Sequence, residues 1–238
     1  GTPTWTTDVP DTLFANPNAL ALDGVEDYVV MNGVADDVGG EASLSLWVKA
    51  ASDRGVNQAL LGANTSTGGN VVVLFIRDND EYQLYDGTSN AWEGDTNTDV
   101  ADGSWHHLAY TTDGTTGRLY VDGVEKATHT PDYAFSNNDL WSIGQEWDGG
   151  SPTNFLDGTV DDVRVYNGVL SAAEVQALAG GYDIDTHDIT LAGDVTYNGG
   201  VFEAGGGTVI LDGSTPQNLD TAGLAFHNLT VNSGATLV

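Results

Sequence analysis

The stretch Ser43-Leu44-Ser45-Leu46-Trp47-Val48-Lys49 decides the fold class, because polar and apolar residues alternate along most of its length. Alternation with a period of two is typical of a β-strand that buries one face of a sheet. Leu44, Leu46 and Val48 are therefore predicted to point into a core. The positions between them, Trp47 included, are predicted to lie on the outer face of the same sheet.

Most of the chain up to residue 182 repeats this theme, with short apolar segments between Gly, Asp and Asn turns. An all-β fold follows, in which Asp122-Gly123 forms a type I′ hairpin turn. One short helix is predicted where Ser171 and Glu174 form a capping box, and Gly180-Gly181 would end it. The predicted strands cover residues 19–22, 28–31, 43–49, 71–76, 82–85, 105–110, 118–121, 124–127, 140–143 and 159–166.

The charge balance of the chain excludes several classes of partner. The 238 residues carry 35 acidic and 6 basic side chains, a net charge of −29. Nucleic acid and anionic membrane surfaces both require a basic patch, so neither is expected as a partner. No apolar run reaches the roughly 18 residues that a membrane-spanning helix needs. A surplus of carboxylates suits salty or calcium-rich water, which predicts a secreted or cell-surface protein.

Cysteine is absent, which excludes disulfides and thiolate metal sites. The chain begins at Gly1 without a methionine, so we interpret it as a processed product or a fragment of a longer protein. Composition changes after Tyr182, and we expect a lead segment over residues 1–18, a main domain over 19–182 and a small all-β unit over 183–238. In that unit Gly205-Gly206-Gly207 marks a turn or bulge. Strand-like spacing is shown by Val195, Tyr197, Val201, Val209, Leu211, Leu229, Val231 and Leu237.

Taken together, several motifs give the main domain a resemblance to the laminin-G-like (concanavalin A-like) jelly-roll family. The resemblance implies two antiparallel sheets packed face to face, in a module that binds glycans or proteins and often holds a structural calcium. The tail resembles repeat-type segments of large bacterial surface proteins. The motifs, in the family's order, are Leu22-Asp23-Gly24, Asp27-Tyr28-Val29, residues 43–49, Trp105-His106-His107-Leu108-Ala109, residues 117–123, Ile143-Gly144, residues 155–166 and Leu170-Ser171-Ala172-Ala173-Glu174.

Calcium is the first chemical hypothesis, because carboxylates and backbone carbonyls are its preferred ligands. In a jelly roll of this kind the first and last strands pair, which would bring Asp23 near Asp161 and Asp162. Neighbouring strand residues point to opposite faces, so only one of Asp161 and Asp162 is expected to ligate unless a bulge intervenes. Alternatively, these carboxylates cap turns or pair with Arg164.

Aromatic platforms are the second hypothesis, because sugars stack on Trp and Tyr rings while their hydroxyl groups need carboxylate or amide partners for hydrogen bonds. Trp92 and Trp147 occur in polar, Gly-rich segments, and Glu146 and Asp148 flank the latter. We predict these four residues, together with the outward Trp47, as ligand-binding candidates. The alternative is that the tryptophans fill the ends of the sandwich.

Catalysis is not expected. A jelly-roll glycosidase needs two carboxylates on one strand face, and related glucanases carry Glu-x-Asp-x-x-Glu. Glu146-Trp147-Asp148 begins like this pattern, but no second Glu follows at the required position. His106-His107 is interpreted as structural, because adjacent strand residues point apart and no third His lies at ligand spacing.

Two functions remain open. The first is a non-catalytic extracellular module that binds polysaccharide or surface glycan, with calcium holding its rim. The second is a structural subunit or repeat of an extracellular fibre, stalk or adhesin, which assembles with copies or neighbouring domains through open β edges such as residues 235–238.

Overall fold

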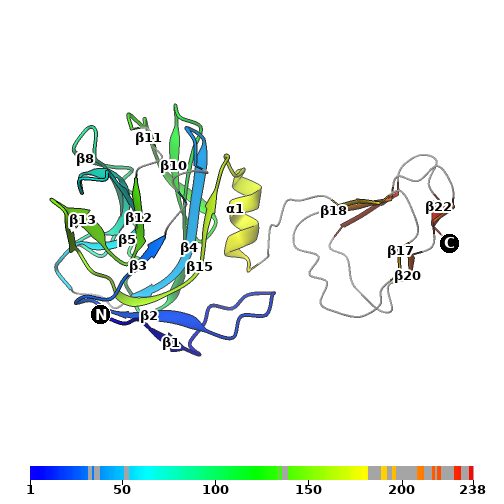
Figure 1. Ribbon diagram of the computed structural model, residues 1–238, viewed down its shortest axis with the longest axis horizontal. Helices are drawn as coiled ribbons and strands as arrows, with labels where there is room; N and C mark the ends of the chain where they lie inside the picture. The colour runs from blue at the N-terminus through cyan, green and yellow to red at the C-terminus, as the bar shows by residue number, and fades with distance from the viewer. Residues whose placement is uncertain are drawn as a thin grey trace. The chain divides into compact units, whose positions relative to one another are not determined.

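A computed structural model describes residues 1–31, 34, 38–50, 54–133, 135 and 139–181 of the chain (Figure 1). Beyond them it describes short strand segments over 189–191, 195–196, 208–211, 216–217, 219–220, 228–231 and 236–237. The chain divides into two units, Gly1–Gly180 and Gly181–Val238.

The first unit is a sandwich of two antiparallel sheets, which confirms the predicted all-β jelly-roll class (Figure 1). The seven-stranded sheet has the order β1 (Thr4–Thr6), β2 (Ala19–Asp23), β15 (Asp157–Tyr166), β4 (Ala42–Ala50), β9 (Trp105–Thr112), β10 (Gly117–Val121) and β11 (Val124–His129). The six-stranded sheet has the order β3 (Val29–Met31), β12 (Leu140–Ile143), β5 (Gln58–Asn64), β6 (Asn70–Ile76), β7 (Tyr82–Asp86) and β8 (Ala91–Glu93). A separate hairpin pairs β13 (Glu146–Asp148) with β14 (Ser151–Thr153).

The core lies between the two sheets and follows the predicted alternation. Leu44, Leu46 and Val48 of β4 are buried in it, as expected from their spacing. On the opposite sheet, Leu74 and Ile76 of β6 belong to the same cluster. Burying such side chains stabilises the fold by roughly 1.5–3 kcal/mol each. Because the inward positions are fixed in this way, the residues between them must lie on the outer faces.

The N-terminal segment covers the outer face of the seven-stranded sheet. The Asp8 carboxylate accepts a hydrogen bond from Lys49 Nζ at 2.8 Å and another from Trp105 Nε1 at 3.1 Å. Further along, Asn16 Nδ2 donates to Asp161 Oδ2 at 2.8 Å. Lys49, Trp105 and Asp161 all lie on outward positions of β4, β9 and β15, so the segment is tied across this face.

Helix α1 (Ala172–Ala179) packs against the seven-stranded sheet beside β9 and β11 (Figure 1). The predicted capping box is present: Ser171 Oγ accepts from the amide of Glu174, and Glu174 Oε2 accepts from the amide of Ser171. Val175 and Leu178 are buried, and the Gly180 amide closes the last turn on the Gln176 carbonyl at 3.0 Å. Among the described residues, no helix has the length and apolar character needed to cross a membrane.

The described segments of the second unit are strands that pair in parallel. β16 (Ile189–Leu191), β18 (Thr208–Leu211) and β21 (Asn228–Val231) form one sheet, in which each residue lies opposite the residue 20 positions further on. The smaller pairs are β17 (Val195–Thr196) with β20 (Leu219–Asp220), and β19 (Pro216–Gln217) with β22 (Thr236–Leu237). Parallel strands at a constant spacing are typical of repeats. The expectations for Tyr197, Val201, Gly205-Gly206-Gly207 and the ends of 235–238 fall outside the described residues.

The β10–β11 turn carries an ionisable network. Asp122 and Gly123 have φ values of 50° and 76°, as a type I′ turn requires. Asp122 Oδ2 lies 2.9 Å from His106 Nδ1, and Asp102 Oδ1 lies 3.2 Å from His106 Nε2. The hydrogen bond to Asp122, more than any other cause, raises the pKa of His106. In contrast, burial lowers the pKa of the neighbouring His107 to about 4.

We expect His106→Gln to lower the free energy of unfolding by about 1 kcal/mol at pH 5 and by less at pH 8. A histidine whose pKa is raised by folding contributes stability below its ordinary pKa, and the contribution disappears as the pH rises through the raised value. Urea denaturation at both pH values measures the difference. An equal loss at both would show that ion pairing contributes nothing.

Candidate functional site

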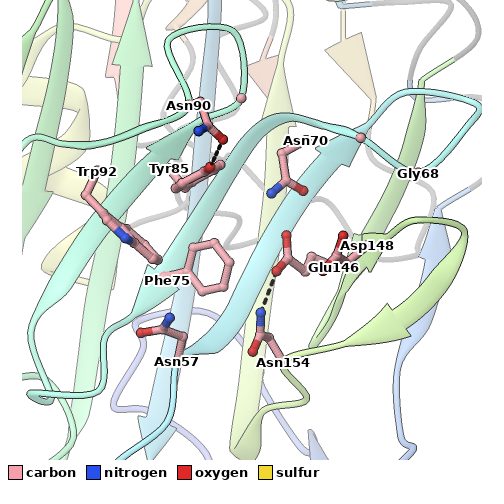
Figure 2. A pocket seen from close by; sticks show the side chains of 12 residues that line it. Asn57, Gly68, Asn70, Phe75, Tyr85, Asn90, Trp92, Glu146, Asp148 and Asn154 are labelled. Atoms are coloured by element: carbon pink, nitrogen blue, oxygen red, sulfur yellow. Dashed lines mark hydrogen bonds between the residues drawn. The ribbon is translucent and has the colours of Figure 1, made fainter.

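A cavity of about 430 Å³ lies on the outer face of the six-stranded sheet (Figure 2). β6, β7 and β8 supply one side of it, and the β13–β14 hairpin supplies the other. The lining is mixed, with aromatic rings, amides and two carboxylates. The lining residues are Asn57, Gly68, Gly69, Asn70, Phe75, Tyr85, Gly87, Asn90, Trp92, Glu146, Asp148 and Asn154.

The aromatic side of the cavity follows from the register of the sheet. Since Leu74 and Ile76 of β6 point into the core, Phe75 points to the outer face. The neighbouring strands add Tyr85 of β7 and its partner Trp92 of β8. The Trp92 ring lies edge-on to Phe75 and Tyr85, with centroid distances of 5.0 and 5.1 Å. The three rings therefore brace one another in one apolar surface (Figure 2).

Arg77 fixes the Trp92 ring without lining the cavity. Its guanidinium carbon lies 3.9 Å from the centroid of that ring. Its nitrogens also donate to Asn57 Oδ1 at 3.2 Å, to Gln83 Oε1 at 2.8 Å and to Asp78 Oδ1 at 3.2 Å. The positive charge is thus held by the ring, two amides and a carboxylate.

Glu146 stands on the polar side, pointing from β13 between Asn70 and Asn154 (Figure 2). Its side chain is 95% buried, since the residue is only 5% exposed. One carboxylate oxygen, Oε1, accepts a hydrogen bond from Asn154 Nδ2. The other, Oε2, is buried and has no hydrogen-bond partner in the protein. Burial raises the pKa of Glu146, although the amides of Asn154 and Asn70 act in the opposite direction.

Glycines allow the loops at the rim to approach closely. Gly68 has a φ of 80°, and a Cβ there would lie 2.4 Å from the backbone nitrogen of Gly150. The Gly149 amide donates to the Gly68 carbonyl at 3.1 Å. Behind this contact, Asn64 Nδ2 donates to the Trp147 carbonyl at 3.1 Å and to Asn70 Oδ1. These bonds hold the β13–β14 hairpin, and with it Glu146, against the sheet.

The cavity brings together three of the five predicted ligand-binding residues. Trp92, Glu146 and Asp148 line it. Trp147 does not, because strand alternation turns its ring to the opposite side of β13, edge-on to Tyr28 at a centroid distance of 6.0 Å. Trp47 lies on the other sheet and is only 8% exposed, with its ring edge-on to His107 at 5.4 Å. The prediction of an open Trp47 platform is therefore wrong.

The sequence analysis missed Phe75, Tyr85 and the amides of Asn57, Asn90 and Asn154. Residues 71–76 form a continuous apolar run, which is typical of a strand covered on both faces. All six residues are buried, so the outer face is covered as well: Ala59, Val73 and Phe75 form a small outer cluster, against which Tyr85 and Trp92 pack beside the cavity.

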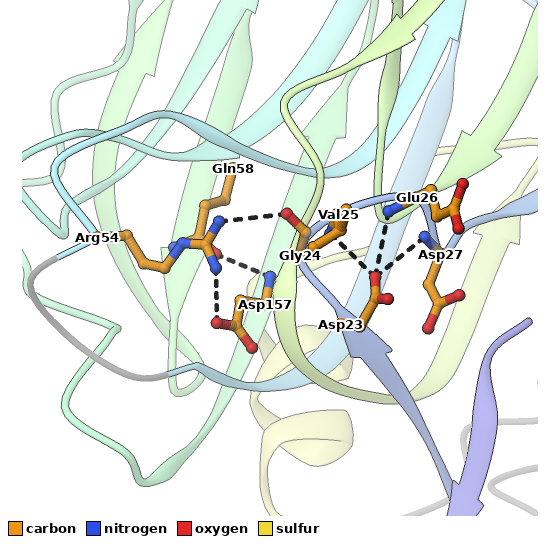
Figure 3. A network of polar contacts seen from close by, with 8 residues as sticks. All are labelled: Asp23, Gly24, Val25, Glu26, Asp27, Arg54, Gln58 and Asp157. Atoms are coloured by element: carbon orange, nitrogen blue, oxygen red, sulfur yellow. Dashed lines mark hydrogen bonds and ion pairs between the residues drawn. The ribbon is translucent and has the colours of Figure 1, made fainter. Parts of the chain in front are cut away.

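Asp23, the first predicted calcium ligand, stabilises the turn after β2 (Figure 3). Its Oδ1 accepts three backbone amides of residues 25–27, at 2.9, 3.2 and 3.3 Å. The bond from Val25 is the largest of the causes that lower the pKa of Asp23. Across the strand pair Asp23 faces Asp157, whose carboxylate is bound to Arg54 at 2.6 Å.

The structure does not bring Asp23 together with Asp161 and Asp162. β2 and β15 do pair, but Asp161 lies four residues beyond Asp157, about 13 Å along the strand. Asp162 sits at a bulge with a φ of 44° and binds Arg164 Nε at 2.7 Å. In the described part of the chain, no three acidic or histidine side chains gather as a metal site would require. These three carboxylates do not fit one shared ion, and calcium stays a prediction.

Comparison with known proteins assigns the fold to a family. Residues 23–176 match the family model Laminin_G_3, the concanavalin A-like lectin/glucanases superfamily. The chain belongs to this family. A curated relative from Rattus norvegicus, "Sushi, von Willebrand factor type A, EGF and pentraxin domain-containing protein 1", is 28% identical over 181 residues. The match covers 68% of this chain but only 5% of the rat protein.

Two solved structures share the concanavalin A-like fold. Domain 4 of AbnA, an extracellular GH43 arabinanase from Geobacillus stearothermophilus in complex with arabinotriose, has a TM-score of 0.61 and 24% identity. This match covers 75% of the present chain and 82% of the other. The CBM40 domain of the Ruminococcus gnavus IT-sialidase, bound to α2,3-sialyllactose, has a TM-score of 0.55 and 16% identity, with coverages of 68% and 96%.

We expect Glu146→Gln to raise the free energy of unfolding at pH 7 by about 1 kcal/mol. A glutamate whose pKa is raised by folding destabilises the protein above that raised value, and the penalty vanishes as the pH falls below the ordinary 4.5. The gain should therefore shrink as the pH approaches 4.

Thermal melting at pH 7 and pH 4 measures this gain. Glu41→Gln, at an exposed position, makes the same change of net charge as a control. A loss of stability at pH 7 in the Glu146 variant alone would mean that its charge is paired in the folded protein.

Proposed function

We propose that the first unit is a non-catalytic saccharide-binding module, and that the saccharide binds in the cavity over β6, β7 and β8. The observation that carries this proposal is the position of the Glu146 carboxylate opposite the rings of Tyr85 and Trp92, which pack against the buried ring of Phe75. The apolar C–H faces of a sugar ring stack on aromatic surfaces, and its hydroxyl groups donate to carboxylates. One cavity offers both kinds of contact at once.

The size and the composition of the cavity also support a saccharide. A volume of about 430 Å³ lies within the range of small-molecule sites. The four amides of Asn57, Asn70, Asn90 and Asn154 can each donate and accept, which matches the dual character of hydroxyl groups. The arabinanase domain and the CBM40 domain, whose folds are similar, are described in complex with saccharides.

Binding rather than hydrolysis is favoured by the incomplete carboxylate pattern of the β13–β14 hairpin. A glycosidase needs an acid and a second carboxylate that flank the scissile bond. Glu146 is buried, whereas Asp148 is exposed at the tip of the β13–β14 hairpin. Gly149 and Gly150 follow it, so this hairpin supplies no third carboxylate.

We also propose an extracellular setting, on the grounds of the net charge of −29 and of a similar domain in an extracellular arabinanase. Calcium remains a separate proposal.

The alternative role in a fibre or stalk is supported by the parallel strands that recur every 20 residues in the second unit. Sedimentation distinguishes the two roles, because a fibre subunit assembles with increasing concentration and a binding module stays monomeric.

We expect Trp92→Ala to weaken saccharide binding by at least about tenfold, because it removes the largest ring of the apolar surface. The full chain is first screened on a glycan array, with calcium and with a chelator, and the best saccharide is then titrated by calorimetry. Trp5→Ala is the matched control, since Trp5 is 74% exposed on β1 and lies outside the cavity. Equal affinities for both variants, with unchanged melting temperatures, would overturn the proposed site.

A further inference from the structure

We infer that the cavity selects neutral saccharides and rejects those that carry a carboxylate, and that Glu146 is the residue that determines this specificity. The inference rests on the proposed function and names the class of ligand for the same site. It follows from the charges that line the cavity, from the position of the nearest cation, and from the unpaired oxygen of Glu146.

The lining carries negative charge only. Among the twelve described residues that form it, Glu146 and Asp148 are acidic, four are Asn, three are aromatic, three are Gly and none is basic. An anionic saccharide would therefore meet like charges with no compensating cation. Juxtaposed like charges are strongly unfavourable in a binding site, and more so where water is excluded.

The nearest cation is not available to an acidic sugar. Arg77 lies against the Trp92 ring, and its donors are directed to Asn57, Gln83 and Asp78. All three of its nitrogens already bind acceptors within the protein, and a move toward a sugar carboxylate would take the guanidinium away from the ring that it supports. The structure thus holds this arginine as a support of the Trp92 ring and not as an anion receptor.

The unpaired oxygen of Glu146, Oε2, favours neutral saccharides. This oxygen is buried in a side chain that is 95% covered, and it accepts no hydrogen bond from the protein. A carboxylate oxygen can only accept, so its complement is a hydroxyl group, which donates. A sugar carboxylate at the same place has no proton to give and adds a second negative charge. A buried acceptor left unpaired discriminates strongly against such a ligand.

The test uses matched trisaccharides on the full chain. Cellotriose, galactotriose and mannotriose are each titrated as the neutral sugar and as the derivative oxidised at C6, in which a carboxylate replaces the hydroxymethyl group. We expect a neutral trisaccharide to bind at least roughly 100-fold more tightly than its oxidised form. Equal or tighter binding of the oxidised forms overturns the inference and leaves the proposed saccharide site standing. If none of the six sugars binds and the glycan array also shows no binding, both the inference and the proposed saccharide site are overturned.

Glu146→Gln separates the local effect of this residue from the charge of the whole chain. The amide keeps an acceptor toward Asn154 and removes the charge, so we expect the neutral sugar to bind about tenfold more weakly and the ratio of neutral to oxidised affinities to narrow. Glu41→Gln removes one charge at an exposed position and should leave the ratio unchanged. An unchanged ratio in the Glu146 variant overturns its role.

Discussion

Period-two alternation along the paired strands is the constraint on which both the core and the cavity depend. Because Leu74 and Ile76 are buried between the sheets, strand alternation places Phe75 on the outer face. The register then sets Tyr85 of β7 opposite Val73, diagonal to Phe75, and sets Trp92 of β8 opposite Tyr85. A shift of register by one residue would turn the rings into the core and expose the aliphatic side chains. The aromatic surface is therefore as stable as the core packing that defines it.

The two outer faces of the sandwich differ in what covers them, and this difference explains the unlike environments of two tryptophans. On the seven-stranded sheet, Asp8 and Asn16 bind outward side chains and tie the N-terminal segment across the face that includes Trp47. On the six-stranded sheet, the β13–β14 hairpin covers part of the outer face and leaves the cavity lined by Trp92. Both tryptophans were predicted as ligand-binding candidates, and the covering segments decide which one remains accessible.

Local patterns in the sequence predicted local structure well, including the alternation of residues 43–49, the Asp122-Gly123 turn and the capping box at Ser171. Contacts between distant segments were beyond such patterns. Pairing of the first and last strands was foreseen, but the register that sets Asp23 opposite Asp157 depends on both sheets together. One error was avoidable: three consecutive residues of a strand cannot all face one ligand. Glu146 and Asp148 line the cavity, so Trp147 between them had to point away.

The proposed recognition role gives a reason for the environment of Glu146, which folding alone does not. A buried carboxylate oxygen without a partner costs stability, and burial raises the pKa of the group because its charge is poorly solvated. A glutamine would satisfy the same bond to Asn154 at lower cost. Hydroxyl groups of a bound ligand would supply the missing hydrogen bond and compensate the cost only in the complex. An unpaired buried carboxylate oxygen beside an ordered aromatic surface is what a site optimised for binding is expected to show.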